Sequence, residues 1–356
     1  MPRHIRKPGL YAEMLVLLLA VSALLTAHTG RAQDLPYEDY LEQMRVCPKE
    51  CHCPPSIPSA MYCDGKDLKS IPTIPPHTRY LYLQNNQIET ILKEAFSNAT
   101  QLRWLNLNHN KITSEGLKEG ALEGLPALLY LYMEDNLMTR VPTPLPPNLE
   151  QLRLSRNRIS KIPPGVFAKL SRLALLDLHA NQLQDDAVME ANLKGLTSLV
   201  QINLAKNSLR NMPPRLPATT IQIFLDSNSI EKIPAGYFNG LPKIAFLRLN
   251  RNKLANGGLP KDIFKMSSIL DLQLSHNQLT EVPQIPASLE QLHLSHNLIK
   301  SVNGTSICPG PTDAPDSYTE DQIPRLRYLR LDGNDVQPPI PLDLLICFRL
   351  LTAVII

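Results

Sequence analysis

The sequence predicts an α/β solenoid, in which a curved parallel β-sheet forms the concave face and short helical, 3-10 and polyproline-type returns form the convex face. Three observations predict it: a leucine pattern that recurs about every 23 residues, prolines gathered at the turns of some repeats, and six cysteines placed only near the two ends of the 356-residue chain. Repeats of this length stack, and together they bury a core that none could bury alone. Aromatic residues are only 5% of the chain, so we expect an aliphatic core.

The first 32 residues are typical of a secretory signal peptide. Basic residues precede an apolar run over residues 14–27, and Gly30 and Ala32 supply the small residues of a cleavage site. A membrane anchor is the weaker interpretation, because 14 apolar residues are fewer than the roughly 18 to 20 needed to span a bilayer. Removal of residues 1–32 takes away four basic residues and one acidic residue, so 32 of each remain and the formal charge falls from +3 to zero. Net charge thus gives no reason to expect nucleic acid or a membrane as a partner.

An acidic segment, residues 33–46, follows the signal peptide. Four acidic residues and no basic one lie between residues 34 and 42, which predicts a tail outside the folded core. Tyr37 and Tyr40 are flanked by acids there and are candidate sulfotyrosines, with a plain acidic tail as the alternative.

The repeat has the form Leu-x-x-Leu-x-Leu-x-x-Asn-x-Leu, with clear copies at residues 102–112, 149–159, 173–183 and 289–299. This is a leucine-rich repeat. Its Leu-x-Leu part predicts a short strand with alternate side chains in the core, and its Asn amide can satisfy backbone groups where the chain turns. Residues 351–356 are a candidate for a twelfth copy. The eleven repeat asparagines are Asn86, Asn110, Asn136, Asn157, Asn181, Asn207, Asn228, Asn252, Asn277, Asn297 and Asn334.

The spacing of these asparagines has a superperiod of three repeats. Successive steps are 24, 26 and 21 residues, then 24, 26 and 21, then 24, 25 and 20. The short steps contain proline-rich returns at residues 141–146, 212–217 and 282–286. Extended polyproline-type returns need no hydrogen-bond ladder and are shorter than helical ones. Each 24-residue step, the first of its superperiod, contains a phenylalanine that is expected to fill the core: Phe96, Phe167 and Phe238.

The cysteines lie where a solenoid needs caps over its apolar ends. Four fall between Cys47 and Cys63 and permit three pairings, although the closeness of Cys51 to Cys53 disfavours joining those two. A zinc site is the less favoured alternative, because thiols in an oxidising compartment form disulfides. Near the other end, an enlarged repeat contains Cys308, and a bridge to Cys347 would close it. The expected organisation is a cap over 47–77, repeats one to ten over 78–300, and an enlarged ear repeat with the C-terminal cap over 301–356.

Taken together, the four-cysteine cluster, the superperiod and the enlarged penultimate repeat resemble the small leucine-rich proteoglycans of the extracellular matrix, over residues 47–356. The spacing Cys-x3-Cys-x-Cys-x9-Cys is similar to that of the fibromodulin and lumican subgroup. The resemblance implies the disulfides Cys47–Cys53, Cys51–Cys63 and Cys308–Cys347. It also implies a secreted core protein that carries N-linked keratan sulfate, binds fibrillar collagen, and regulates fibril diameter and spacing, with the corneal stroma as an expected tissue.

Two sequons, at Asn98 and Asn303, are candidate N-glycosylation sites in a secreted chain. The sequence contains no Ser-Gly dipeptide, so a serine-linked chondroitin or dermatan chain has no ordinary attachment point. Any sulfated glycan is therefore expected mainly on asparagine.

Residues between and beside the inward leucines should line the concave face and supply the collagen contacts. Those near the amino-terminal end are aromatic, and aromatic side chains either anchor a partner or stabilise neighbouring strands. Further along, charges of both signs are mixed, which suits a charged partner that is neutral overall, such as a collagen triple helix. A homodimer formed through this face is an arrangement that the sequence leaves open. The collagen-binding candidates are Tyr82, Trp104, Tyr132, Arg153, Asp226, Arg248, Arg330 and Asp332.

Histidines form a second group of polar candidates. His276 and His296 occupy equivalent places on adjacent repeats, with His293 nearby, and strand spacing of about 4.8 Å could bring the imidazoles together. Solvated histidines at a rim are favoured over a metal site. The chain lacks the motifs of serine hydrolases, zinc proteases and phosphate-binding loops, so we expect neither an enzyme nor a cofactor. The alternative function is a soluble ligand trap that binds a growth factor or receptor.

Overall fold

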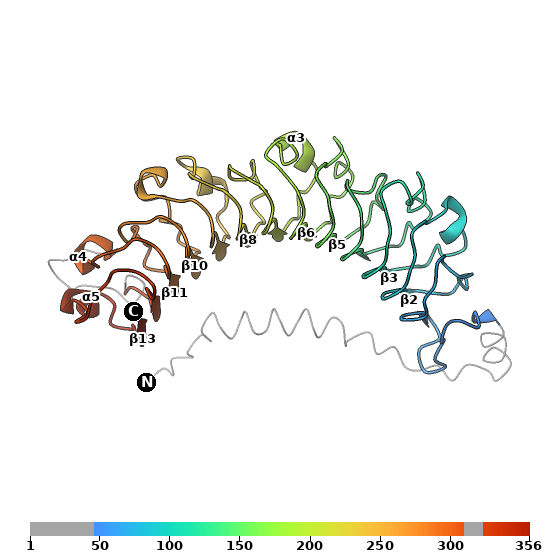
Figure 1. The fold of residues 1–356 in the computed structure, drawn as a ribbon, viewed down its shortest axis with the longest axis horizontal. Helices are drawn as coiled ribbons and strands as arrows, with labels where there is room; N and C mark the ends of the chain where they lie inside the picture. The colour runs from blue at the N-terminus through green and yellow to red at the C-terminus, as the bar shows by residue number, and fades with distance from the viewer. Residues whose placement is uncertain (1–45, 310–322) are drawn as a thin grey trace, which may run out of the picture.

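The computed structural model describes residues 46–309 and 323–356. Within these residues, thirteen three-residue strands form one parallel sheet whose order follows the chain, and the sheet curves into an arc (Figure 1). The predicted signal peptide and the sulfotyrosine candidates Tyr37 and Tyr40 lie outside the described residues. The strands are β1 (Ala60–Tyr62), β2 (Tyr80–Tyr82), β3 (Trp104–Asn106), β4 (Tyr130–Tyr132), β5 (Gln151–Arg153), β6 (Leu175–Asp177), β7 (Gln201–Asn203), β8 (Gln222–Phe224), β9 (Phe246–Arg248), β10 (Asp271–Gln273), β11 (Gln291–His293), β12 (Tyr328–Arg330) and β13 (Ala353–Ile355).

The strands are short because each repeat supplies only one inward residue between two outward ones. From β2 to β12 the central residue is an aliphatic side chain with 0% exposure, and its neighbours on either side are partly or fully exposed. The central residues of adjacent strands pair in register, as Leu105 does with Leu81 and Leu131. The predicted aliphatic core therefore runs the length of the arc, and the outward residues line its concave side.

The repeat asparagines join the repeats to one another. In Asn110, the amide nitrogen donates hydrogen bonds to the carbonyls of Leu83 (2.9 Å) and Leu107 (3.1 Å), and the amide oxygen accepts one from the N–H of Ile88 (3.1 Å). Two of these partners belong to the preceding repeat. Because the same arrangement recurs along the solenoid, the asparagines form a buried polar ladder beside the leucine core.

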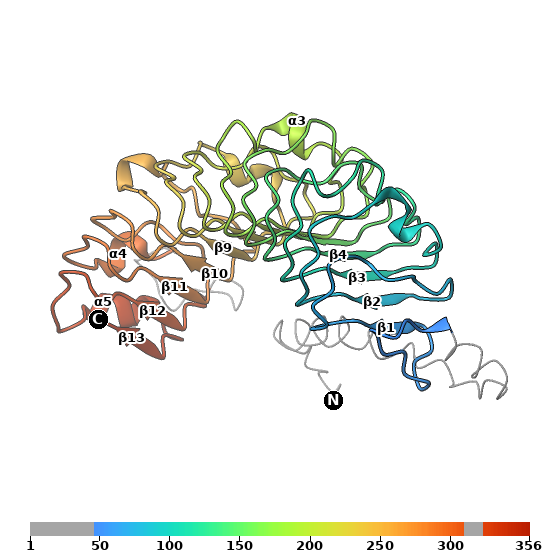
Figure 2. The same ribbon diagram turned by 45° about the vertical axis from the view of Figure 1, so that its right-hand side comes forward.

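The returns lie on the convex side, opposite the strands (Figures 1 and 2). Phe96, Phe167 and Phe238 are buried there, as expected. The proline-rich returns contain no helix among the described residues, whereas helical turns occur in other returns and in the C-terminal region. These turns are η1 (Lys93–Phe96), α3 (Glu190–Leu193), η2 (Tyr237–Gly240), η3 (Asn256–Gly258), α4 (Gly304–Ile307) and α5 (Leu342–Cys347). None of the helices in the described ranges is long and apolar enough to cross a membrane.

Disulfides close both ends of the solenoid. Cys47 is joined to Cys53 and Cys51 to Cys63, beside β1. The third bridge joins Cys308, just after α4, to Cys347 at the end of α5. These are the three pairs that the family resemblance implies. The fragment considered as a twelfth repeat supplies β13, which pairs with β12 and extends the sheet.

Candidate binding face on the concave sheet

Aromatic rings cover the concave face at its amino-terminal end. The rings of Tyr62 and Tyr82 stack in parallel with their centroids 4.6 Å apart. The ring centroid of Trp104 lies 5.2 Å from that of Tyr130. It lies 4.7 Å from the centroid of Tyr132, in an edge-on contact. The rings pack on one another and are half-buried rather than fully exposed, so they stabilise neighbouring strands while still presenting an aromatic surface.

Arg153 extends this aromatic surface toward the middle of the arc. Its guanidinium lies 5.0 Å from the ring centroid of Tyr132, within the range of a cation–π contact. The hydroxyl of Tyr132 donates a hydrogen bond to Gln151 Oε1 at 2.9 Å, and burial raises the pKa of Tyr132 to about 12. The predicted candidates Tyr82, Trp104, Tyr132 and Arg153 thus lie side by side on β2 to β5.

A second group of candidates forms an ion pair between adjacent repeats. Arg248 Nε lies 3.0 Å from Asp226 Oδ2, and its guanidinium lies 5.3 Å from the ring centroid of Phe224. The other oxygen of Asp226 accepts a hydrogen bond from the N–H of Asn250 at 2.9 Å. Asp226 therefore has both charge and hydrogen-bond partners, while the Arg248 side chain remains 45% exposed.

The third group lies near the carboxyl end of the sheet. Arg330 Nε donates a hydrogen bond to Asp332 Oδ1 at 2.7 Å, and the hydroxyl of Ser295 donates to the same oxygen at 2.7 Å. The hydrogen bond from Arg330 is the main reason that the pKa of Asp332 lies below its ordinary value. The eight candidates thus occupy one face but form three separate groups, at β2 to β5, at β8 and β9, and at β12.

The histidines meet as the spacing of the repeats predicts. The rings of His276 and His296 stack with their centroids 4.4 Å apart, and His293 contacts the ring of Tyr328 at 5.2 Å. His293 Nε2 also lies 4.0 Å from Asp271 Oδ1. Burial lowers the pKa of His293 and raises that of Asp271. In the described ranges, no three His, Cys, Asp or Glu side chains are placed to hold a metal ion.

A regular feature that sequence reasoning missed is the backbone conformation just before each repeat asparagine. In ten repeats this residue is not glycine, and it has a φ between 52° and 59°. In the eleventh repeat it is Gly333, with a φ of 72°. We call these eleven residues the rim row, because they lie just beyond the ends of the strands. Its members are Asn85, His109, Asp135, Arg156, Ala180, Lys206, Ser227, Arg251, His276, His296 and Gly333.

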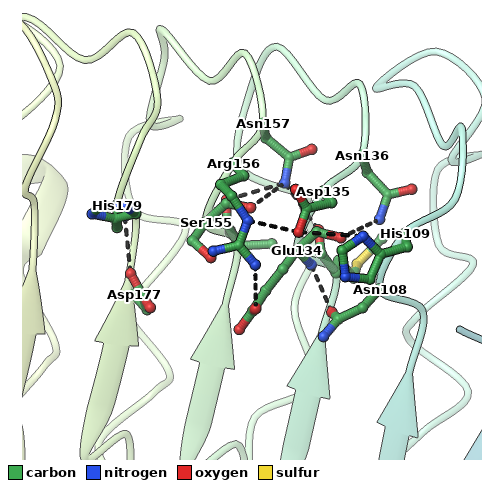
Figure 3. A network of polar contacts seen from close by, with 12 residues as sticks. Asn108, His109, Glu134, Asp135, Asn136, Ser155, Arg156, Asn157, Asp177 and His179 are labelled. Carbon is green, nitrogen blue, oxygen red and sulfur yellow. Dashed lines mark hydrogen bonds and ion pairs between the residues drawn. The ribbon is translucent and has the colours of Figure 1, made fainter. Parts of the chain in front are cut away.

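Side chains of the rim row contact one another across repeats (Figure 3). Asp135 lies between His109, whose Nδ1 is 3.5 Å away, and Arg156, whose Nε is 2.7 Å away. Arg156 also forms an ion pair with Glu134, with Nη2 lying 3.2 Å from Oε2. Burial is the main cause of the raised pKa of Glu134. The sequence does contain a signal for this row, since β-branched residues, which avoid positive φ, are absent from all eleven positions.

The two sequons lie away from the concave strands. Asn98 is exposed just after η1 on a return, and Asn303 is exposed just before α4. Both sequons therefore lie outside the strands of the concave sheet.

Comparison with known proteins agrees with this architecture. The family model of the leucine rich repeat N-terminal domain matches residues 46–75, and the leucine rich repeat model matches residues 76–138 and 147–209. A chain in the solved octameric complex of Latrophilin 3, Unc5D and FLRT2 has the same fold, with a TM-score of 0.66 at 23% identity, covering 86% of this chain and 83% of that one. Fold and caps together define a leucine-rich-repeat protein.

The curated relatives narrow this class further. Keratocan of Danio rerio is 63% identical over 343 residues, which cover 96% of this chain and 98% of the relative. Keratocan of Homo sapiens is 61% identical over 313 residues, covering 87% and 88%. Prolargin of Mus musculus is 53% identical over 312 residues, covering 87% and 82%. The chain belongs to the small leucine-rich proteoglycans of the extracellular matrix, in the group of keratocan, which confirms the resemblance carried by its cysteines and repeats.

Proposed function

We propose that this protein binds fibrillar collagen through its concave face, limits the lateral growth of fibrils, and keeps fibrils apart through N-linked keratan sulfate. The observation that carries the proposal is the concave face itself, where an aromatic surface is followed by two arginine–aspartate pairs. A triple helix presents both proline rings and charges of either sign. The aromatic rings and Arg153 suit contact with the proline rings. The pairs Arg248–Asp226 and Arg330–Asp332 can instead form ion pairs with the charged side chains of the triple helix.

The placement of the sequons supports the second half of the proposal. Asn98 and Asn303 are exposed and lie off the concave sheet, so glycans on both would project from a core protein that is seated on a fibril. The proposal involves no catalytic step.

The experiment is collagen fibril assembly with the purified glycoprotein, followed by turbidity and by electron microscopy of fibril diameter. We expect wild type to lower the turbidity plateau and to narrow the fibrils. Asp226→Asn and Arg330→Gln should each lose about half or more of the effect, because each removes one charge of an arginine–aspartate pair on the concave face. Asp226→Asn keeps an oxygen for the N–H of Asn250, which spares the backbone contact.

Matched controls are Asp186→Asn and Arg215→Gln, which make the same charge changes at exposed positions outside the strands. Both should act like wild type. Keratanase treatment should leave fibril diameter unchanged and reduce the distance between fibrils. Fibrils that are identical with and without wild-type protein would exclude the collagen proposal, and nanomolar binding of a growth factor in that case would favour the ligand-trap alternative.

A further inference from the structure

Two basic side chains of the rim row, Lys206 and Arg251, line a shallow hollow at the edge of the concave sheet. Lys206 and Arg251 are both exposed members of the row. Together with His179, Asp226 and Arg248 they line a shallow hollow of about 290 Å³ at the edge of β7 to β9. With three fixed cations and one carboxylate, this hollow has a net positive charge although residues 33–356 as a whole are neutral.

The cations of this hollow differ in whether they are already paired. Asp226 is engaged by Arg248 and by the N–H of Asn250. Neither Lys206 nor Arg251 has an ion pair with any residue that the structure describes. Two cationic groups at this edge are therefore available to an external anion.

The rim row extends this pair into a regular series. Each even-numbered repeat, from the second to the tenth, places an exposed basic residue or histidine in the row: His109, Arg156, Lys206, Arg251 and His296. The backbone torsion φ is nearly the same at all of them, so each occupies an equivalent place at the end of its strand. The stack of His276 on His296 shows that neighbours in the row lie at strand spacing. Every second repeat therefore corresponds to roughly 9 to 10 Å along the rim.

We propose that the rim row from Arg156 to Arg251 is a binding site for a linear sulfated polysaccharide. The spacing of its cations is about the length of one disaccharide unit, so successive sulfates of an extended chain can meet successive cations. Sulfate is a compact oxyanion of the kind that Lys and Arg bind. A row in which basic groups outnumber the single acid, Asp135, suits a polyanion better than it suits a triple helix of mixed charge. Arg156 is held by Asp135 and Glu134, so Lys206 and Arg251 provide the stronger contacts.

The test measures binding of the full glycoprotein to immobilised chondroitin sulfate, keratan sulfate and unsulfated hyaluronan over a range of salt concentrations. The double variant Lys206→Gln, Arg251→Gln should weaken binding to sulfated chains roughly tenfold at physiological salt and lower the slope of log K against log salt by about 1.5 to 2. Arg156→Gln should have a smaller effect. Comparison of the two sulfated chains shows whether a keratan sulfate chain or the chondroitin sulfate of another proteoglycan is the better ligand.

The matched control is Lys169→Gln, Lys243→Gln, which removes the same two charges from exposed positions outside the rim row and should bind like wild type. An equal loss in this control would overturn the proposal, because net charge would then explain the binding. Equal affinity for hyaluronan would also overturn it. So would binding of a sulfotyrosine peptide of residues 33–46 at this site with no binding of sulfated polysaccharide. Thermal unfolding of each variant establishes that the fold is intact. The fibril experiment with Arg330→Gln is independent of either result, because Arg330 does not line this hollow.

Discussion

At the scale of single residues, the solenoid depends on two positions that lie next to each other in every repeat. The asparagine satisfies carbonyls and N–H groups of two repeats at once, and the rim residue before it adopts the left-handed conformation that turns the chain toward it. That conformation costs an L-residue about 1 to 2 kcal/mol. Its recurrence at every asparagine indicates that the hydrogen bonds of the buried amide offset the cost.

Replacement of one such asparagine should therefore destabilise the two repeats that it joins. Asn110 is 7% exposed, and Asn110→Ala leaves the N–H of Ile88 without its acceptor. The buried carbonyls of Leu83 and Leu107 each lose one of their two amide donors. We expect a loss of about 2 to 4 kcal/mol in the free energy of unfolding, measured by urea denaturation. Asn239→Ala, at an exposed position in η2, should change it by less than about 0.5 kcal/mol. Equal effects of the two substitutions would show that the ladder contributes no special stability.

At the scale of elements, the sequence was sufficient to place the strands and the returns. Leu-x-Leu is a local pattern, and the asparagine spacing gives the length of each return, so both can be obtained without knowing the neighbours. The meeting of His276 with His296 was also predictable, because parallel strands in register bring equivalent positions together.

The pairing of side chains between repeats was not predictable in the same way. Arg248 pairs with Asp226 of the preceding repeat, whereas Arg330 pairs with Asp332 of its own repeat. Both arginines occupy the same position of the repeat, so the choice depends on which acidic side chain each rotamer can reach. Glu134, which was not singled out from the sequence, joins the rim network for the same reason.

The C-terminal disulfide joins the regions of α4 and α5 and should stabilise only the end of the solenoid. Cys308 and Cys347 are 39 residues apart, and in the chain-entropy account removal of a bridge of this length costs about 2 to 4 kcal/mol. Because repeats contact only their neighbours, the loss should be confined to the end of the solenoid. For Cys308→Ser, Cys347→Ser we expect faster amide hydrogen exchange in β12 and β13 and no change in β2 to β5.

The N-terminal bridge between Cys47 and Cys53 is a suitable comparison. It spans six residues, so its removal should cost about 1.5 kcal/mol less, with faster exchange at β1 instead. Exchange that rises evenly along the whole sheet in either variant would contradict local capping.

At the scale of the whole molecule, three histidines with lowered pKa values, on the concave sheet and at its rim, connect stability to pH. His179, His276 and His293 all have a pKa below the ordinary value of 6.5, and burial is the largest cause for each. A nearby carboxylate partly opposes burial by raising the pKa of each histidine: Asp177 for His179, Asp332 for His276 and Asp271 for His293. A nearby cation lowers each pKa further: Lys206 for His179, Arg251 for His276 and Arg330 for His293.

The sign of the effect follows from proton uptake. With a lower pKa in the folded state, the unfolded chain binds more protons as the pH falls below about 6.5, so stability is complete above that pH and decreases below it. Burial raises the pKa of Asp177 and Asp271 from 3.8, so the stability contribution of these carboxyls is greatest at low pH. The contribution of these carboxyls is lost as the pH rises through their folded pKa.

The melting temperature of the wild-type protein should therefore fall between pH 7.5 and pH 5.5, as measured by differential scanning calorimetry. The triple variant His179→Gln, His276→Gln, His293→Gln retains both carboxyls but has no imidazole at these positions, so its melting temperature should fall less over the same range. The comparison concerns the slope with pH, because loss of the His276–His296 stack can also change stability at pH 7.5. Parallel curves for the two proteins would show that burial of these histidines does not govern the acid sensitivity of the solenoid.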